Sequence, residues 1–230
     1  MFNIKIADIS VGIDNKYKFI KNMCHDYITL DKAKFTVSVT DEEIAREQTG
    51  EAEFPPDYLE ALAVYRKIAE KLSEYEGFLM HGVLISVEDR GVLFCAASGT
   101  GKTTHALLWK ELLGDKCDII NGDKPIVRIR EGVPYAYGTP WCGKENIHKN
   151  TSVRITDIYF VHRAEENSVE DMMRREILPS LLPSIHIPEN GVGKVLEAID
   201  AFARSVSFKR LYCNRDIAAA KVAYNAIFGE

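Results

Sequence analysis

The segment Ser98-Gly99-Thr100-Gly101-Lys102-Thr103-Thr104 combines residue types that bind phosphate. Gly99 and Gly101 can turn successive backbone N–H groups toward an anion, because glycine has no Cβ to obstruct the approach. Lys102 can neutralise the β- and γ-phosphates of a nucleotide, and the hydroxyl of Thr103 can bind Mg²⁺. We therefore expect all seven residues to contribute to a site for a nucleoside triphosphate.

The elements on either side of this segment are those that a phosphate-binding loop requires. The apolar run 91–94 predicts a strand, and the helical periodicity from His105 to Leu113 ends at Gly114. The N-terminus of that helix would add partial positive charge at the loop. One position departs from the pattern G-x-x-x-x-G-K-[ST], since Ala96 stands where the first glycine is usual. An ordinary glycine-rich turn before a helix is the alternative interpretation.

Two further residues could complete a site for phosphoryl transfer. Transfer needs a carboxylate near the phosphates to bind the metal, and a group that takes the proton of the acceptor. Asp123 ends the short apolar stretch 117–123 and is placed for one or both roles, although Asn121-Gly122-Asp123 could also be a simple turn. His81 begins the strand pair that leads into the loop, but a lone histidine there is more often a core residue.

The loop from Gly138 to Lys144 is rich in glycine and proline, and binding residues are frequent in such loops. We expect Trp141 and Lys144 to contact an anionic or phosphorylated acceptor, because an aromatic ring and a cation stand close together. The alternative is a partly buried Trp141 beside a surface lysine. The sequence does not choose among the cations that could stabilise transition-state charge, which are Arg128, Arg130, Arg163 and Lys194.

A strand beginning at His81, a hairpin, the loop, a helix and a strand ending in Asp123 resemble the catalytic domain of HPr kinase/phosphorylase. The loop itself is similar to that of ATP-dependent phosphoenolpyruvate carboxykinases. The resemblance covers roughly residues 80 to 130 well, and the stretches 121–125 and 138–144 resemble those of a bacterial group of HPr-kinase-related proteins. It implies that His81 is the active-site histidine, Lys102 the loop lysine and Asp123 the aspartate that accepts the proton.

The chain also departs from that family. Lys124 occupies the position of the family's second aspartate, and Thr104 replaces the glutamate after the loop serine or threonine. The long N-terminal domain of HPr kinases is not evident in residues 1–80. These differences weigh against HPr itself as the substrate and against a phosphorylase reaction, and they leave nucleotide binding unaffected.

The expected fold is an α/β protein, a P-loop domain like that of phosphoenolpyruvate carboxykinase and HPr kinase, with mixed β-sheets and flanking helices. We assign this domain to residues 77–230, and expect residues 1–76 to form a β-rich segment plus an amphipathic helix, about 57–75, packed on it. Hairpins are expected at 81–94 and 125–137, and strands at 152–162 and 208–213. Ser168-Val169-Glu170-Asp171 suggests a capping box for a helix reaching Leu182, and helices are expected at 194–206 and 216–228.

Composition excludes several classes of protein. The net charge of −5 argues against broad binding to nucleic acid or an anionic membrane. The five scattered cysteines form no C-x-x-C pair, which suits a reducing compartment. No secretory segment or membrane-length apolar run is evident, so we expect a cytoplasmic location, no membrane partner and no nucleic acid partner. A homo-oligomer remains open.

These observations predict an ATP- and Mg²⁺-dependent kinase that transfers the γ-phosphoryl group to a hydroxyl of a protein, peptide or small molecule. A small carboxykinase-like decarboxylase is a weaker alternative, because the chain is short for that family and lacks its arginine motifs. A nucleotide-binding regulator with vestigial catalysis is the third interpretation, prompted by Ala96 and Lys124.

Overall fold

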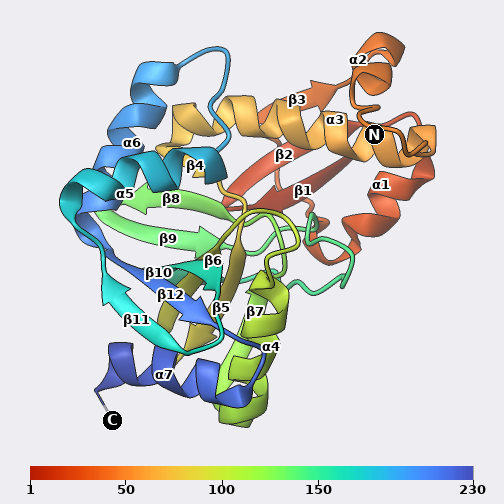
Figure 1. Cartoon of the computed structure of the whole chain (residues 1–230). Helices are drawn as coiled ribbons and strands as arrows, with labels where there is room; N and C mark the ends of the chain where they lie inside the picture. Colours follow the sequence, from red (N-terminus) through yellow and green to blue (C-terminus); the bar gives the residue numbers. More distant parts are fainter. Residues whose placement is uncertain (230) are drawn as a thin grey trace.

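The computed structural model describes residues 1–229, which fold around two β-sheets (Figure 1). The larger sheet has the strand order β4-β8-β9-β10-β6-β5-β7, with β12 beside β10 and β11 beside β12. The strands of this sheet are β4 (Gly77–Leu79), β5 (Val83–Val87), β6 (Arg90–Cys95), β7 (Cys117–Asn121), β8 (Ile126–Arg130), β9 (Val133–Tyr137), β10 (Ser152–Arg163), β11 (Ser168–Asp171) and β12 (Ser207–Cys213). The sheet is mixed: β6 and β12 run parallel to β10, whereas β9 is antiparallel to it.

The middle of this sheet positions the phosphate-binding segment. β5 is antiparallel to both β6 and β7, with Val83 opposite Phe94 and Leu84 opposite Asn121. The start of β5 therefore lies beside the ends of β6 and β7. Residues just before β5, just after β6 and just after β7 must meet at this one edge of the sheet, although they are distant in the sequence.

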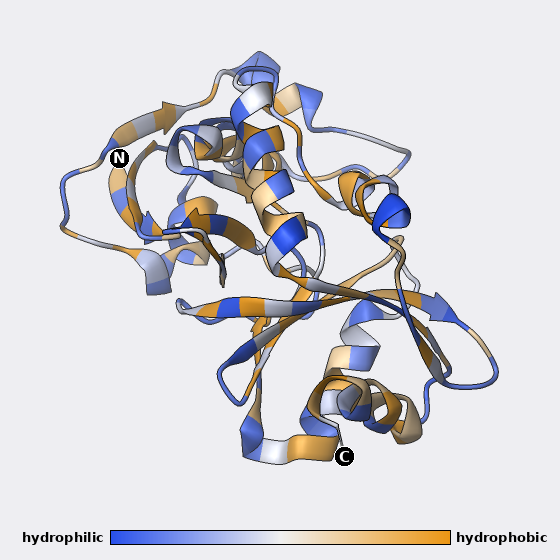
Figure 2. Ribbon diagram, turned by 90° about the vertical axis from the view of Figure 1, so that its left-hand side faces the viewer, coloured by the Kyte–Doolittle hydropathy of each residue, from blue (hydrophilic) through white to orange (hydrophobic). Residues whose placement is uncertain are grey.

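Helices cover both faces of the large sheet. On one face, α4 (Lys102–Leu113) and α7 (Ile217–Phe228) bury Phe94, Trp109 and Tyr159 in a common core. On the other face, α6 (Val192–Ser205) follows α5 (Arg174–Leu181) and buries Phe202 against Phe78. Hydrophobic and hydrophilic residues alternate along these helices, as expected when only one side of each is buried (Figure 2). Short 3₁₀ turns occur at 25–27, 72–75, 114–116 and 182–184.

Residues 1–76 form the smaller sheet and three helices. The sheet has the order β1-β2-β3, made by β1 (Phe2–Ile6), β2 (Ile9–Asp14) and β3 (Phe35–Ser38). Its helices are α1 (Lys18–Met23), α2 (Asp41–Arg46) and α3 (Pro56–Lys71). The core under α3 is continuous with Leu79, Ile126, Tyr137 and Trp141 of the later chain. α3 therefore lies between the small sheet and the edge that holds the phosphate-binding segment.

Most of the expected elements are present, but the prediction for residues 168–182 is wrong in its first half. Residues 168–171 are a strand, β11, paired antiparallel with β12, and the helix begins only at Arg174. The side chain of Glu176 accepts a hydrogen bond from the backbone N–H of Met173, which marks the true start of that helix. Strand pairing with β12 therefore outweighs the local capping signal at Ser168. Within residues 1–229, every helix is too short or too polar to cross a membrane.

Candidate active site

The phosphate-binding segment is a loop between β6 and α4 in which glycine is required by conformation. Gly99 has φ of +75° and Gly101 has φ of +122°, and Gly101 directly precedes the first helical residue, Lys102. A Cβ at either glycine would meet no atom within 4 Å, so backbone conformation and not crowding selects glycine. The loop thus delivers its backbone N–H groups and the N-terminus of α4 to the same place.

Arg163, the last residue of β10, holds the loop from behind. Its Nε donates a hydrogen bond to the carbonyl oxygen of Thr100 at 3.1 Å, and its Nη2 donates to the carbonyl oxygen of Gly99. In a trans peptide the C=O and the following N–H point in opposite directions. The N–H of Gly101 is therefore aimed away from the guanidinium, toward the open side of the loop.

Lys102 lies along the loop with only 8% of its surface exposed. Its ammonium donates hydrogen bonds to the carbonyl oxygens of Ala96 at 2.9 Å and Ala97 at 3.4 Å. Burial lowers the pKa of Lys102, while the negative charge of Asp123 opposes that shift. Phosphate oxygens could replace the two carbonyl oxygens as partners of this ammonium and would compensate its charge more fully.

His81 and Asp123 form a hydrogen-bonded pair at the edge where β5 starts and β7 ends. Nε2 of His81 lies 3.1 Å from Oδ1 of Asp123, and the N–H of Gly82 donates to the backbone oxygen of Asp123 at 2.8 Å. Burial would raise the pKa of Asp123, but the hydrogen bond from His81 and the nearby positive charges outweigh it and lower the pKa. Asp123 is therefore ionised at neutral pH, ready to bind a cation or accept a proton.

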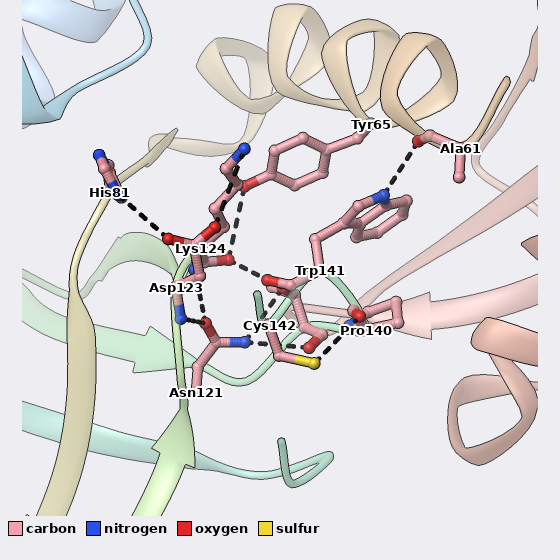
Figure 3. A network of polar contacts seen from close by, with 10 residues as sticks. Ala61, Tyr65, His81, Asn121, Asp123, Lys124, Pro140, Trp141 and Cys142 are labelled. Atoms are coloured by element: carbon pink, nitrogen blue, oxygen red, sulfur yellow. Dashed lines mark hydrogen bonds and ion pairs between the residues drawn. The ribbon is translucent and has the colours of Figure 1, made fainter. Parts of the chain in front are cut away.

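The turn that carries Asp123 is built on Asn121, which is fully buried. Oδ1 of Asn121 accepts hydrogen bonds from the N–H of Asp123 at 3.0 Å and the N–H of Lys124 at 2.6 Å. Its Nδ2 donates to the carbonyl oxygen of Thr139 at 2.9 Å. A buried amide thus fixes the direction in which the carboxylate of Asp123 leaves the turn (Figure 3).

Trp141 joins this turn to α3. Its Nε1 donates to the carbonyl oxygen of Ala61 at 2.9 Å, and its ring packs on Tyr65 with centroids 4.6 Å apart (Figure 3). Nζ of Lys124 lies 5.6 Å from the centroid of Tyr65 and 4.0 Å from Oδ2 of Asp123. Trp141 is only 5% exposed, so most of its ring supports the loop and only an edge can meet a ligand.

A single cleft of about 690 Å³ brings most of the expected site residues together. They are His81, Ser98, Gly99, Gly101, Lys102, Thr103, Thr104, Asp123, Trp141 and Lys144. Thr100 lines two other cavities beside the loop, of about 220 Å³ and about 790 Å³. The cleft therefore combines a phosphate-binding loop, a carboxylate–imidazole pair and the 138–144 loop.

Three of the four candidate transition-state cations lie elsewhere. Arg128 donates to the backbone oxygens of Tyr75 and Ala7, and Arg130 pairs with Asp8, so both join the two parts of the chain. Lys194 lines a different groove. Only Arg163 lies at the loop, where it contacts loop carbonyls.

Several residues of the cleft carried no signal in the sequence. Phe19 and Met23 on α1 and Tyr58 and Leu62 on α3 form one wall of it. Their approach depends on how residues 1–76 pack, which periodicity does not reveal. The role of Asn121 could have been inferred, because Asn-Gly-Asp after a strand favours a side-chain-stabilised turn.

The donors present fit a magnesium ion that is held mainly by phosphates. Within residues 1–229, no cluster of three or more His, Cys, Asp or Glu side chains could hold a metal alone. Mg²⁺ bound to nucleotides usually takes only one or two protein ligands, with phosphate oxygens and water completing its shell. Thr103 and the ionised Asp123 line the same cleft and can supply those ligands.

No protein-family model matches the sequence, and no curated protein matches it. Among solved structures, the chain is similar to the Hpr(Ser) kinase/phosphatase from Coxiella burnetii. The TM-score is 0.41 and the identity 8%, over 66% of this chain and 91% of that chain. Likeness at this level carries no argument about function, so functional conclusions have to come from the cleft itself.

Proposed function

We propose that the protein is a phosphotransferase that uses Mg²⁺ and ATP to phosphorylate a hydroxyl group. The observation that carries this proposal is the hydrogen-bonded pair of His81 and Asp123 in the same cleft as the Lys102 loop. A site for nucleotide binding alone would need the loop but no ionised carboxylate beside it. The combination of the two supports chemistry at the terminal phosphate.

Each residue then has a definite task. The loop N–H groups and Lys102 bind the β- and γ-phosphates, and Lys102 gives up the carbonyl oxygens of Ala96 and Ala97 to do so. Thr103 and Asp123 would hold Mg²⁺, which when bound neutralises charge on the phosphates. His81 orients the carboxylate of Asp123 through their shared hydrogen bond.

The reaction is a transfer of one phosphoryl group. The acceptor oxygen forms a bond to the γ-phosphorus while the bond from that phosphorus to the β,γ-bridging oxygen breaks, and ADP leaves with the electron pair. The hydroxyl proton passes to the carboxylate of Asp123. Because the pKa of Asp123 is lowered, the carboxylate is a weak base, and it passes the proton on to solvent in the open cleft while His81 remains its hydrogen-bond donor.

A nucleotide-binding regulator with weak catalysis is the second candidate. The position of Lys124 favours it, because an ammonium 4.0 Å from Oδ2 of Asp123 competes with metal and proton for that carboxylate. In this case ATP would bind as tightly as in an enzyme, but turnover would stay close to background with every acceptor.

Single-turnover assays with γ-labelled ATP separate the two candidates. A kinase should transfer the labelled γ-phosphoryl group to an acceptor or, more slowly, to water. Asp123→Asn should reduce the rate of this transfer by about 10²–10⁴-fold, the usual contribution of a general base. ATP should still bind to this variant, because the amide retains the shape of the turn. Equal, background-level rates in wild type and Asp123→Asn would favour the regulator.

A further inference from the structure

The mouth of the cleft carries a row of exposed aromatic side chains. Phe19 and Tyr58 line the cleft and are 37% and 36% exposed, and their ring centroids lie 6.2 Å apart. Phe54, 42% exposed, continues the row with its centroid 5.4 Å from that of Tyr58. Single exposed hydrophobic residues are ordinary, but three in contact at the entrance of a cleft indicate a binding surface.

The row stands on the acceptor side of the site. In phosphoryl transfer the attacking and leaving oxygens lie on opposite sides of the phosphorus, so acceptor and nucleoside approach from opposite directions. Asp123 and His81 share the cleft with Phe19 and Tyr58. Two cavities that Phe19 and Tyr58 do not line also border the loop, one of about 220 Å³ lined by Leu108 and one of about 790 Å³ lined by Ser98, and both remain for the nucleoside.

The row also leads out of the cleft, since Phe54 is not among the residues that line it. A ligand that covers all three rings must therefore extend along the surface as well as reach Asp123. An extended peptide advances about 3.3 Å per residue and can place side chains on successive rings. A compact small molecule could fill the cleft but would leave Phe54 uncovered.

We propose that Phe19, Tyr58 and Phe54 select the acceptor, and that the acceptor is a peptide segment with large apolar or aromatic side chains near its reactive hydroxyl. The inference rests on the proposed function and adds the class of its substrate. Residues 1–76 then act as the specificity-determining part of the enzyme. The later residues, which include the phosphate-binding loop and Asp123, carry out the phosphoryl transfer.

A peptide library tests this proposal. Each peptide carries one serine, one fixed neighbouring residue and degenerate remaining positions without Ser, Thr or Tyr, and transfer from γ-labelled ATP is measured. Wild type should prefer aromatic or large aliphatic residues over Gly or Asp by about tenfold at one or more positions, the scale of burying one such side chain. Phe19→Ser combined with Tyr58→Ser should abolish the preference and leave the Kd for ATP unchanged.

Tyr17→Ser is the matched control, because Tyr17 is 38% exposed on the same segment and does not line the cleft. A flat wild-type profile, or a preference that survives the double substitution, overturns the proposal. So does a weaker Kd for ATP in the double variant, which would assign the rings to the nucleoside. Turnover of ATP without phosphorylation of any peptide refutes the peptide acceptor alone, whereas failure to bind ATP refutes the proposed function as well.

Discussion

Nε2 of His81 lies 3.1 Å from Oδ1 of Asp123, although one residue precedes β5 and the other follows β7. The antiparallel pairing of these strands brings the two side chains to one edge of the sheet. β6 ends at the same edge and delivers Lys102. Sheet topology, more than any local motif, therefore assembles the site, and this arrangement leads to five predictions.

Lys102→Ala should remove nucleotide binding, because the phosphates lose their principal cation. At ATP concentrations about 100-fold above Kd, ligand binding stabilises a protein by about 2.7 kcal/mol. For a chain of this size that corresponds to a rise in melting temperature of roughly 5–10 °C. Thermal shift with Mg-ATP should show this rise in wild type and in Lys116→Ala, an exposed lysine just after α4. A normal shift in Lys102→Ala would exclude Lys102 from the site.

Arg163→Ala should weaken ATP binding by loosening the phosphate-binding loop. The guanidinium holds the carbonyl oxygens of Gly99 and Thr100, and hydrogen bonds to charged groups contribute about 1.5–3 kcal/mol. We expect ATP to bind roughly 10- to 100-fold more weakly by calorimetry, with partial recovery in Arg163→Lys. Arg204→Ala, which removes a surface pair with Asp200 on α6, is the control. Unchanged affinity in Arg163→Ala would mean that the loop keeps its shape unaided.

Asn121→Ala should damage both stability and turnover. The substitution leaves the N–H groups of Asp123 and Lys124 without their shared acceptor in a partly buried turn. Each unsatisfied buried group costs about 1–3 kcal/mol, so urea unfolding should report a loss of at least that size. Asn121→Asp retains the accepting oxygen but loses the donor to Thr139, and should keep more activity than Asn121→Ala. Full activity in both variants would show that the turn does not orient Asp123.

The stability contributed by Asp123 should depend on pH. Its pKa is lowered in the folded protein, so its contribution is present above the ordinary aspartate pKa, about 3.9, and is lost as pH falls through the folded value. The difference in unfolding free energy between wild type and Asp123→Asn should therefore be present at pH 5 and shrink as the pH falls below about 4. Urea titrations at several pH values measure it, with Asp115→Asn at the exposed end of α4 as control. If the stability difference instead grows as the pH falls below about 4, the pKa of Asp123 is not lowered in the folded protein.

Lys144→Ala should affect the acceptor more than the nucleotide. Lys144 lines the cleft on the exposed loop beyond Trp141 and not on the phosphate-binding loop. We expect a higher KM for a phosphorylated peptide and an unchanged Kd for ATP, with Lys144→Arg close to wild type. If ATP affinity falls as far as in Lys102→Ala, the 138–144 loop belongs to the nucleotide pocket instead.

The order of strands and helices was largely predictable because apolar runs and helical periodicity are separated by turn residues. β5, β6 and β7 are short apolar runs that are buried almost throughout, and the hairpin of β5 and β6 places His81 near the loop. The contact with Asp123 needed one further fact, namely that β7 pairs with the outer edge of β5. Periodicity could not reveal that pairing, and the resemblance implied only that both residues belong to one active site.

Long-range pairing explains what the sequence did not reveal. Residues 168–171 satisfy a capping pattern, yet β12 offers them a partner strand and they extend instead. The turn at Ala7 and Asp8, with φ of +49° and +59°, joins β1 to β2 without the glycine or asparagine that usually signals such a turn. Phe19 and Tyr58 meet at the cleft only because α1 packs against α3.

The hydrogen bond from Trp141 to Ala61 anchors the 138–144 loop on a helix that is synthesised well before it. Residues 1–76 leave the ribosome first, so α3 is available before the 138–144 loop needs its support. A fragment that begins at residue 77 would keep Lys102 and its loop but lose the carbonyl that anchors Trp141. It would also expose Leu79, Ile126 and Tyr137, which share one core with residues 1–76, so the site depends on both parts of the chain.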